Sequence, residues 1–379
     1  MIEDKKTAKE ASAQQKRHWV RITRACNNNC LFCLDRENQN GSIFRVAEIV
    51  ADLNEGLKAG ARRVVISGGD PTVHPKLAMI IKKAKKMGYM HVQIITNGRM
   101  LAYEKFAAEL KKAGLDEVTL SLHSHLREDF EKMTGVMGSY NQALTGLLNA
   151  QKQGFIVSVD IVINKINYQK LKETLQFYIK LGVSEFDLLY PIPFGSAWEN
   201  RQQLFFAPEK ASKALSAAFA FSKNKNLFIW TNRLPAQYLE GFEDLIQNPI
   251  KIHDEVRGMR RELAGFIEKG KPMTCQGERC QHCFMQNFCA DLVELRKKKK
   301  LSGKSAPICW KSKTVKKEKG VVFKFDENFT LEKFTNFYIN SRYFVKSLRC
   351  QKCKHFNVCD GAWIEDVRSG GFSRLKPKA

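Results

Sequence analysis

Short apolar, β-rich runs alternate with amphipathic helical stretches from Trp19 to about Ser222. Glycines stand at the ends of five helical patterns, where a left-handed C-terminal cap is needed. This alternation predicts parallel strands joined by right-handed crossovers. The fold class we expect is α/β, a partial (β/α)6 TIM-like barrel, open on one side. The predicted strands are Trp19–Thr23, Arg63–Ser67, His91–Thr96, Glu117–Leu122, Phe155–Ile163 and Glu185–Tyr190; the helices are Val46–Ala59, Pro75–Met87, Tyr103–Ala113, Asn141–Gln153, Tyr168–Leu181 and Pro208–Ser222; the capping glycines are Gly60, Gly88, Gly114, Gly154 and Gly182.

The pattern breaks down after about Asn226, although Leu227–Trp230 has the composition of one more strand. We therefore predict a polar N-terminal tail at 1–17, a barrel domain at 18–225 and a smaller cysteine-rich α+β domain at 226–379. A lysine-rich linker is expected at about 296–320.

Composition narrows the class of protein. The N-terminal segment lacks an apolar core, and no apolar run approaches the roughly 18–20 residues of a membrane span, so we expect a cytoplasmic protein without a membrane partner. In a reducing cytosol, eleven cysteines indicate metal ligands and not disulfides. The net charge of +24 leaves nucleic acid open as a partner. It is not favoured, because aromatic residues do not interleave with the lysines.

Cys26, Cys30 and Cys33 form the string CNNNCLFC directly after the first predicted strand. Thiolates select zinc, copper(I) and iron–sulfur clusters, and both a structural zinc and a cubane cluster take four ligands. Three thiolates without a nearby fourth ligand leave one metal position open for reaction. The plainer alternatives are half of a zinc site or three unrelated thiols.

The spacing C-x3-C-x2-C, with Phe32 before the last cysteine, resembles the signature of the radical S-adenosylmethionine (SAM) superfamily. The resemblance extends from His18 to about Gly195. It implies a [4Fe–4S] cluster whose unique iron chelates SAM, and reductive cleavage of SAM to a 5′-deoxyadenosyl radical that abstracts hydrogen from a substrate.

Polar strand ends supply candidate SAM contacts. Ser67–Pro71 reads SGGDP and resembles the superfamily's GGE motif for the SAM amino group, with Asp70 in place of the usual glutamate. Glycines there allow close approach of the backbone; a tight turn is the structural alternative. The cofactor-binding candidates are Phe32, Gly68, Gly69, Asp70, Asn97, Ser121, His123 and Asn164.

Eight further cysteines make two sets of four. Cys280-x2-Cys283-x5-Cys289 has the spacing of Cys350-x2-Cys353-x5-Cys359, and each triad has one cysteine upstream. We assign Cys275, Cys280, Cys283 and Cys289 to one centre, and Cys309, Cys350, Cys353 and Cys359 to the other. Cys353-x5-Cys359-Asp360-Gly361 resembles the SPASM and twitch extensions of radical SAM enzymes, which implies two auxiliary [4Fe–4S] clusters. Trp363 stands where the full SPASM pattern has a further cysteine, and two zinc sites are the alternative.

The resemblance implies a radical SAM enzyme acting on a peptide or protein side chain, supplied with electrons by a reductant such as flavodoxin or ferredoxin. The alternatives are a small-molecule enzyme acting on a cofactor precursor such as a tetrapyrrole, an RNA-modifying enzyme, and a non-catalytic iron–sulfur module. Fold analogy does not choose among these substrates.

Overall fold

The computed structural model describes residues 15–273, 275, 277–305, 307, 309 and 320–378. They form two compact units, which divide between Asn232 and Arg233. The first unit is residues 15–232, and the second contains the described residues from 233 onward. Most of the predicted tail and residues 310–319 of the predicted linker lie outside the described residues.

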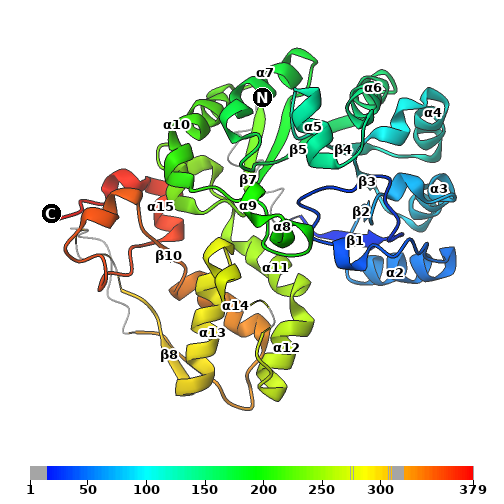
Figure 1. Ribbon diagram of the computed structural model, residues 1–379. Coiled ribbons are helices and arrows are strands. Elements are labelled where there is room, and N and C mark those ends of the chain that lie inside the picture. The colour runs from blue at the N-terminus through cyan, green and yellow to red at the C-terminus, as the bar shows by residue number, and fades with distance from the viewer. Residues whose placement is uncertain are drawn as a thin grey trace. The chain divides into compact units, whose positions relative to one another are not determined.

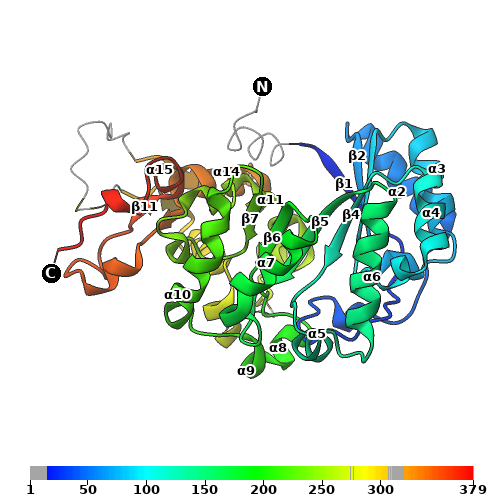
Figure 2. The same cartoon turned by 90° about the horizontal axis from the view of Figure 1, so that it is seen from above.

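Within residues 15–232, seven parallel strands form one curled sheet in the order in which they occur along the chain. Helices cover its outer face, as Figures 1 and 2 show for α2, α3, α4, α6 and α7. The strands are β1 (Arg17–Arg21), β2 (Arg63–Ser67), β3 (His91–Thr96), β4 (Glu117–Ser121), β5 (Ile156–Val162), β6 (Glu185–Leu189) and β7 (Phe228–Asn232). The helices are α2 (Val46–Lys58), α3 (Leu77–Met87), α4 (Glu104–Ala113), α5 (Arg127–Thr134), α6 (Ser139–Lys152), α7 (Leu171–Lys180), α8 (Ser196–Glu199), α9 (Arg201–Leu204) and α10 (Pro208–Phe219).

The predicted α/β partial barrel is confirmed, and the additional strand at Leu227–Trp230 is part of its sheet as β7. β7 pairs in parallel with β6 from Glu185↔Phe228 to Leu189↔Asn232. It therefore belongs to the sheet unit, whereas the sequence analysis set the domain boundary at residue 225. Helix α5, between β4 and α6, was not predicted, because its sequence REDFEKMT is mostly polar and short.

Glycine caps end the helices as the sequence predicts. Gly60, Gly88, Gly114, Gly154 and Gly182 all have positive φ, between 69° and 108°. This left-handed conformation is unstrained for glycine and strained for other residues. The glycines therefore determine where each helix ends and the chain turns toward the next strand.

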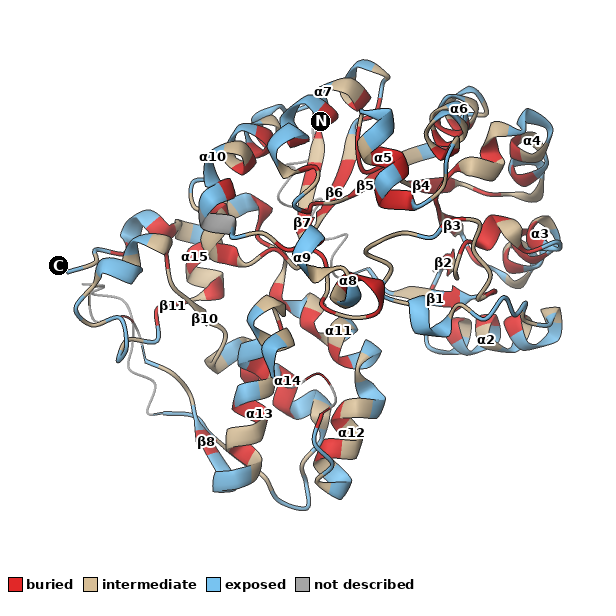
Figure 3. Ribbon diagram, viewed as in Figure 1, coloured by how far each residue is buried: buried red, intermediate tan, exposed pale blue. Residues whose placement is uncertain are grey.

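The two faces of the sheet differ in polarity. Val159 and Ile161 of β5 and Phe186 of β6 are buried, and Figure 3 shows buried positions along the strands and the helix faces that meet them. Alternate residues point to the opposite, concave face. There Gln93 donates to Thr119 at 2.7 Å, and Thr119 shares a hydrogen bond of 2.8 Å with Ser158. The concave face is thus polar, while the core lies between sheet and helices.

The described part of the second unit is built from helices and two short antiparallel strand pairs. Its helices are α11 (Ile252–Gly258), α12 (Arg260–Lys269), α13 (Gln286–Lys298), α14 (Leu331–Ser341) and α15 (Ile364–Gly370). Strand β8 (Lys300–Ser302) pairs with β9 (Val322–Lys324), and β10 (Phe344–Val345) with β11 (Ala362–Trp363). Residues 296–302 of the predicted linker are therefore ordered as the end of α13 and β8.

A membrane-crossing helix is not found in the part of the chain that the structure describes, since no helix there combines the necessary length and apolar character.

Candidate functional site

Cys26, Cys30 and Cys33 lie on the loop that follows β1, and all three are partly buried. Burial, together with the nearby Asp70 carboxylate, raises the pKa of the Cys26 thiol to about 11. Burial also raises the pKa of Cys30 and of Cys33. The free thiols are therefore protonated near neutral pH, and binding of a metal to them releases protons.

Backbone contacts from two neighbouring segments hold the start of this loop. The Gly69 N–H donates to Thr23 O at 2.9 Å, and the Asp70 N–H donates to Ala25 O at 2.8 Å. A Cβ on Gly68 would lie 2.5 Å from Thr23 O, and one on Gly69 would lie 2.3 Å from Ala25 O. These glycines are thus required by the cysteine loop itself, a reason that the sequence analysis did not give.

Two more glycines allow close approach at the middle and end of the loop. A Cβ on Gly135 would lie 2.5 Å from Asn29 O, and one on Gly195 would lie 2.5 Å from Cys33 O. Both residues have positive φ. Neither glycine was predicted as a site residue, because its partner on the cysteine loop is distant in the sequence. The presence of glycine at these two positions was the available signal.

Asp70 is buried at the end of β2 and binds its own neighbours. Its oxygens accept from the Thr72 N–H at 2.9 Å, the Thr72 hydroxyl, the Thr96 hydroxyl at 2.8 and 2.9 Å, and the Asn97 N–H at 2.8 Å. Two carboxylate oxygens offer about four acceptor sites. Asp70 therefore ties the ends of β2 and β3 together, and its acceptor capacity is taken up within the protein.

Asn97 connects the end of β3 to the cysteine loop. Its Nδ2 donates to Asn27 Oδ1 at 2.6 Å and lies 4.0 Å from Cys26 Sγ. Ser121 is half-buried at the carboxyl end of β4. Both predicted residues thus stand at the same edge of the parallel sheet as the loop.

His123 and Phe32 are brought into direct contact. Their ring centroids are 4.6 Å apart in an edge-to-face arrangement. Burial lowers the pKa of His123 to about 3, so its ring is neutral. Its Nδ1 accepts from the Val162 N–H at 3.2 Å, which puts the ring proton on Nε2. His123 therefore supports the cysteine loop through Phe32.

Asn164 is fully buried in the turn after β5. Its Nδ2 donates to Val162 O at 3.0 Å, and its Oδ1 accepts from the Ile166 N–H at 2.9 Å. Both bonds go to backbone groups, so the Asn164 side chain stabilises the turn after β5.

The eight remaining cysteines influence one another within the two predicted sets of four. Burial, together with the thiolates of Cys283, Cys275 and Cys280, raises the pKa of Cys289 to about 12. In the other set, burial raises the pKa of Cys350, with Cys309, Cys353 and Cys359 acting in the same direction. Within each set, a negative charge on one sulfur therefore disfavours a second negative charge on its neighbours.

The two sets repeat one local structure. Residues 279–289 and 349–359 share the pattern Arg-Cys-Gln-x-Cys-x3-Asn-x-Cys. Each begins with a 3-10 turn, Glu278–His282 or Leu348–Lys352, that ends at the second cysteine. Four backbone hydrogen bonds recur at equivalent positions in the two sets. In the first set, all at 3.0 Å, they run from the N–H of Cys280 to Gly277 O, Cys283 to Cys280 O, Gln286 to Cys283 O and Cys289 to Met285 O. In the second set, all at 2.9 Å, they run from the N–H of Cys350 to Ser347 O, Cys353 to Cys350 O, Phe356 to Cys353 O and Cys359 to His355 O.

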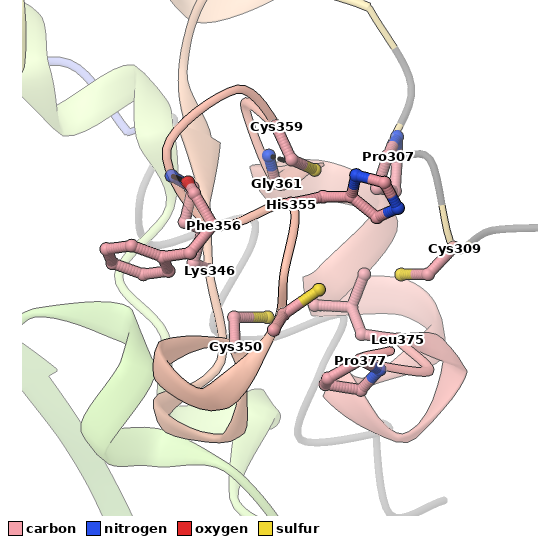
Figure 4. Close-up of a pocket in the computed structure, with 11 residues that line it drawn as sticks. Pro307, Cys309, Lys346, Cys350, His355, Phe356, Cys359, Gly361, Leu375 and Pro377 are labelled. Carbon is pink, nitrogen blue, oxygen red and sulfur yellow. Dashed lines mark hydrogen bonds between the residues drawn. The ribbon is translucent and has the colours of Figure 1, made fainter. Parts of the chain in front are cut away.

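The two sets differ in their surroundings. In the first, burial raises the pKa of Cys283 to about 11. In the second, all four cysteines line one pocket, in which Figure 4 labels Cys309, Cys350 and Cys359. Backbone N–H groups of His355 and Lys378 lower the pKa of Cys353. The second set is therefore the better prepared to present a thiolate.

Among the described residues, no group of three or more His, Cys, Asp or Glu side chains is arranged to enclose a single metal ion. A [4Fe–4S] cluster distributes its thiolate ligands over several irons.

Comparison with known proteins matches residues 20–178 to the Radical SAM superfamily. A protein of Sulfurisphaera tokodaii called "Probable GTP 3′,8-cyclase" is 34% identical over 190 residues, which are 49% of this chain and 60% of that protein. Its namesake in Saccharolobus solfataricus is 32% identical over 180 residues, 46% of this chain and 58% of that protein. The matches thus span less than two thirds of these relatives.

Solved structures with a similar course of the chain include Streptococcus suis SuiB bound to the precursor peptide SuiA, with a TM-score of 0.48 and 16% identity over 64% of this chain and 55% of that one. Another is anSMEcpe with bound AdoMet and a peptide, with a TM-score of 0.49 and 13% identity over 95% of this chain and 92% of that one.

Proposed function

Residues 20–178 form a radical SAM domain, and from that premise we propose that the protein is an enzyme that cleaves SAM reductively. Cys26, Cys30 and Cys33 are its proposed cluster ligands. A [4Fe–4S] cluster with one open iron, when bound there, supplies the electron that converts SAM to a 5′-deoxyadenosyl radical. A reductant such as flavodoxin or ferredoxin provides that electron.

The observation that carries this proposal is the way in which the cysteine loop is held at the carboxyl edge of the sheet. Gly68, Gly69, Gly135 and Gly195 each approach loop backbone so closely that a Cβ there would lie within 2.5 Å of it. A loop fixed at its start, middle and end presents three sulfurs in a constant arrangement. The donors are soft thiolates, and one metal position is left for SAM, so the residues fit the group.

SAM binding falls to the residues around this loop. We assign it to the backbone of Gly68 and Gly69 and to the hydroxyl of Ser121. Asn97 holds the cysteine loop beside them, because its amide bonds both Asn27 and the Arg99 N–H. Phe32 and His123 form one wall beside the loop, 4.6 Å apart. Asp70 and Asn164 act by shaping the strand ends, because their hydrogen-bonding groups are engaged within the protein.

We further propose that the two other cysteine sets hold two auxiliary [4Fe–4S] clusters. The repeated Arg-Cys-Gln-x-Cys-x3-Asn-x-Cys structure supports the same kind of group in both. Metal analysis after anaerobic reconstitution tests this. About twelve irons per chain, four for each of three clusters, are expected. About four irons with two zincs would instead support the zinc alternative.

For the substrate, we propose a small molecule, a cofactor precursor of the nucleotide class. The support is that the relatives found by sequence are called GTP 3′,8-cyclases. Anaerobic incubation of the reduced protein with SAM and GTP tests this. The expected result is 5′-deoxyadenosine formation that rises several-fold with GTP and a new nucleotide product. Adenosine triphosphate in place of GTP is the matched control.

A peptide or protein side chain is the second candidate, favoured by one feature of the sheet. Asp160 pairs directly with Asp187 across β5 and β6, and both alternate with buried residues that face the helices. Two carboxylates on the concave face attract an ammonium group and repel a triphosphate. If GTP produces no response, peptides and free amino acids are the substrates to incubate next.

A further inference from the structure

Each sulfur of the first cysteine set faces the amide of an asparagine or glutamine side chain. Gln39 Nε2 donates to Cys33 Sγ at 3.2 Å. Asn97 Nδ2 lies 4.0 Å from Cys26 Sγ. The Asn28 side chain is hydrogen-bonded to the Cys30 thiol. Three amides thus approach three sulfurs.

The orientation of each amide is fixed at its oxygen end. Arg36 Nη1 donates to Gln39 Oε1 at 3.3 Å, and Arg99 Nη1 donates to Asn28 Oδ1 at 3.0 Å. The backbone N–H of Arg99 donates to Asn97 Oδ1 at 3.1 Å. Guanidinium and backbone N–H groups only donate, so each must face an amide oxygen. The NH2 ends therefore point toward acceptors, which are the sulfurs and, for Asn97, also Asn27 Oδ1 at 2.6 Å.

Arg99 is itself held from two sides. Its Nε donates to Gln142 Oε1 on α6 at 2.6 Å, and its Nη1 also donates to the carbonyl oxygen of Asn27. The guanidinium therefore connects α6 to the part of the loop between Cys26 and Cys30. An arginine fixed in this way keeps the Asn28 amide in one position.

Hydrogen bonds to the sulfurs are one of the factors that set the reduction potential of an iron–sulfur cluster. A reduced cluster carries one more negative charge than an oxidised one, so an N–H donor stabilises the reduced state more strongly. We propose that Asn28, Gln39 and Asn97 form an amide shell that raises the reduction potential of the cluster on Cys26, Cys30 and Cys33, with Arg36 and Arg99 as positioning residues. This inference rests on the proposed function, because it requires that cluster.

The test is a redox titration of the reconstituted full-length protein, followed by electron paramagnetic resonance. The relevant signal is the one that disappears when Cys26, Cys30 and Cys33 are all replaced by alanine. In Gln39→Leu, the equilibrium constant for one-electron reduction is expected to fall by up to about tenfold, which corresponds to a midpoint lower by up to about 59 mV. Arg36→Leu keeps the donor but frees the amide to rotate, so a smaller decrease is expected.

Asn40→Leu is the matched control. Asn40 is the next residue along the chain, and its side chain accepts from the Ser42 N–H at 3.1 Å. The midpoint potential of the cluster in Asn40→Leu is expected to equal that in the unmodified protein. If Gln39→Leu fails to retain a cluster, Gln39→Met, which is close to glutamine in size but has no N–H donor, takes its place.

Unchanged midpoints in the Gln39 and Arg36 variants, with the cluster intact, would overturn the amide shell and leave the proposed function standing. If the unmodified protein shows no signal that depends on the three cysteines, the proposed function fails, and this inference fails with it.

Discussion

Replacing Gly69 by alanine tests how the cysteine loop is held. The new Cβ would lie 2.3 Å from Ala25 O, 2.6 Å from Ala25 C and 3.1 Å from Cys26 Cβ. Relief of these contacts requires a displacement of roughly 1 Å. The Ala25 carbonyl also accepts from the Asp70 N–H at 2.8 Å, so the displacement strains or breaks that bond.

The cost can be worked from these contacts. Overpacking of a rigid site costs about 1–3 kcal/mol, and loss of the hydrogen bond adds about 1 kcal/mol. For a unit of this size, about 2–4 kcal/mol lowers the melting temperature by roughly 5–15 °C. Because Cys26 is pushed directly, iron bound by the first cysteine set is expected to decrease as well.

The assay combines thermal unfolding of the metal-free protein with iron analysis after anaerobic reconstitution. Gly154→Ala is the control, since Gly154 has φ of 69° and a Cβ added there would meet no heavy atom within 4 Å. That variant bears only left-handed backbone strain, about 1–2 kcal/mol, and should keep its iron. If Gly69→Ala unfolds at the temperature of Gly154→Ala and retains all of its iron, the contact argument is wrong.

Two further predictions concern one residue in each unit. Because burial lowers the pKa of His123 to about 3, the unfolded chain takes up its proton first as the pH falls below about 6.5. The free energy of unfolding should therefore decrease by about 2 kcal/mol between pH 6.5 and pH 5. The variant His123→Asn keeps an acceptor for the Val162 N–H, and its unfolding in urea should show a smaller dependence on pH. An equal pH dependence in both proteins would disprove the assignment. In the second unit, Arg342 donates twice to Asp291 of α13, both at 2.7 Å, so Arg342→Met leaves a buried carboxylate and should cost about 3–5 kcal/mol. Asp291→Leu in the same chain should recover much of that loss, and chemical unfolding that finds no recovery would contradict the pairing.

The barrel was predictable because its signals are local. The strand at Arg63–Ser67 and the strand at His91–Thr96 were predicted with the bounds that the structure has, since each is a short apolar run followed by a polar turn. Helix α5 was missed, because a short polar helix carries no clear apolar period. The seventh strand was recognised but assigned to the wrong side of the domain boundary, because its pairing with β6 is a property of the sheet and not of its own sequence.

The sequence identified many of the residues that lie at the site, but the role of several of them could not be predicted. Spacing alone placed Cys309, Cys350, Cys353 and Cys359 in one set, and these four line one pocket in the structure. The roles of Asp70 and Asn164 differ from the expectation, since their partners on neighbouring strands and turns cannot be read from a linear sequence. Gln39 and Arg99 were missed for the same reason: an amide and an arginine become informative only when a sulfur or a carbonyl lies beside them.

Reductive cleavage of SAM is the reaction on which the account depends. The measurement is 5′-deoxyadenosine formed from SAM under anaerobic conditions, with dithionite as the reductant. We expect the reconstituted protein to form it, and the variant with Cys26, Cys30 and Cys33 all replaced by alanine to form none while it keeps the metal of the other two cysteine sets. Formation of 5′-deoxyadenosine by that variant would contradict the central claim.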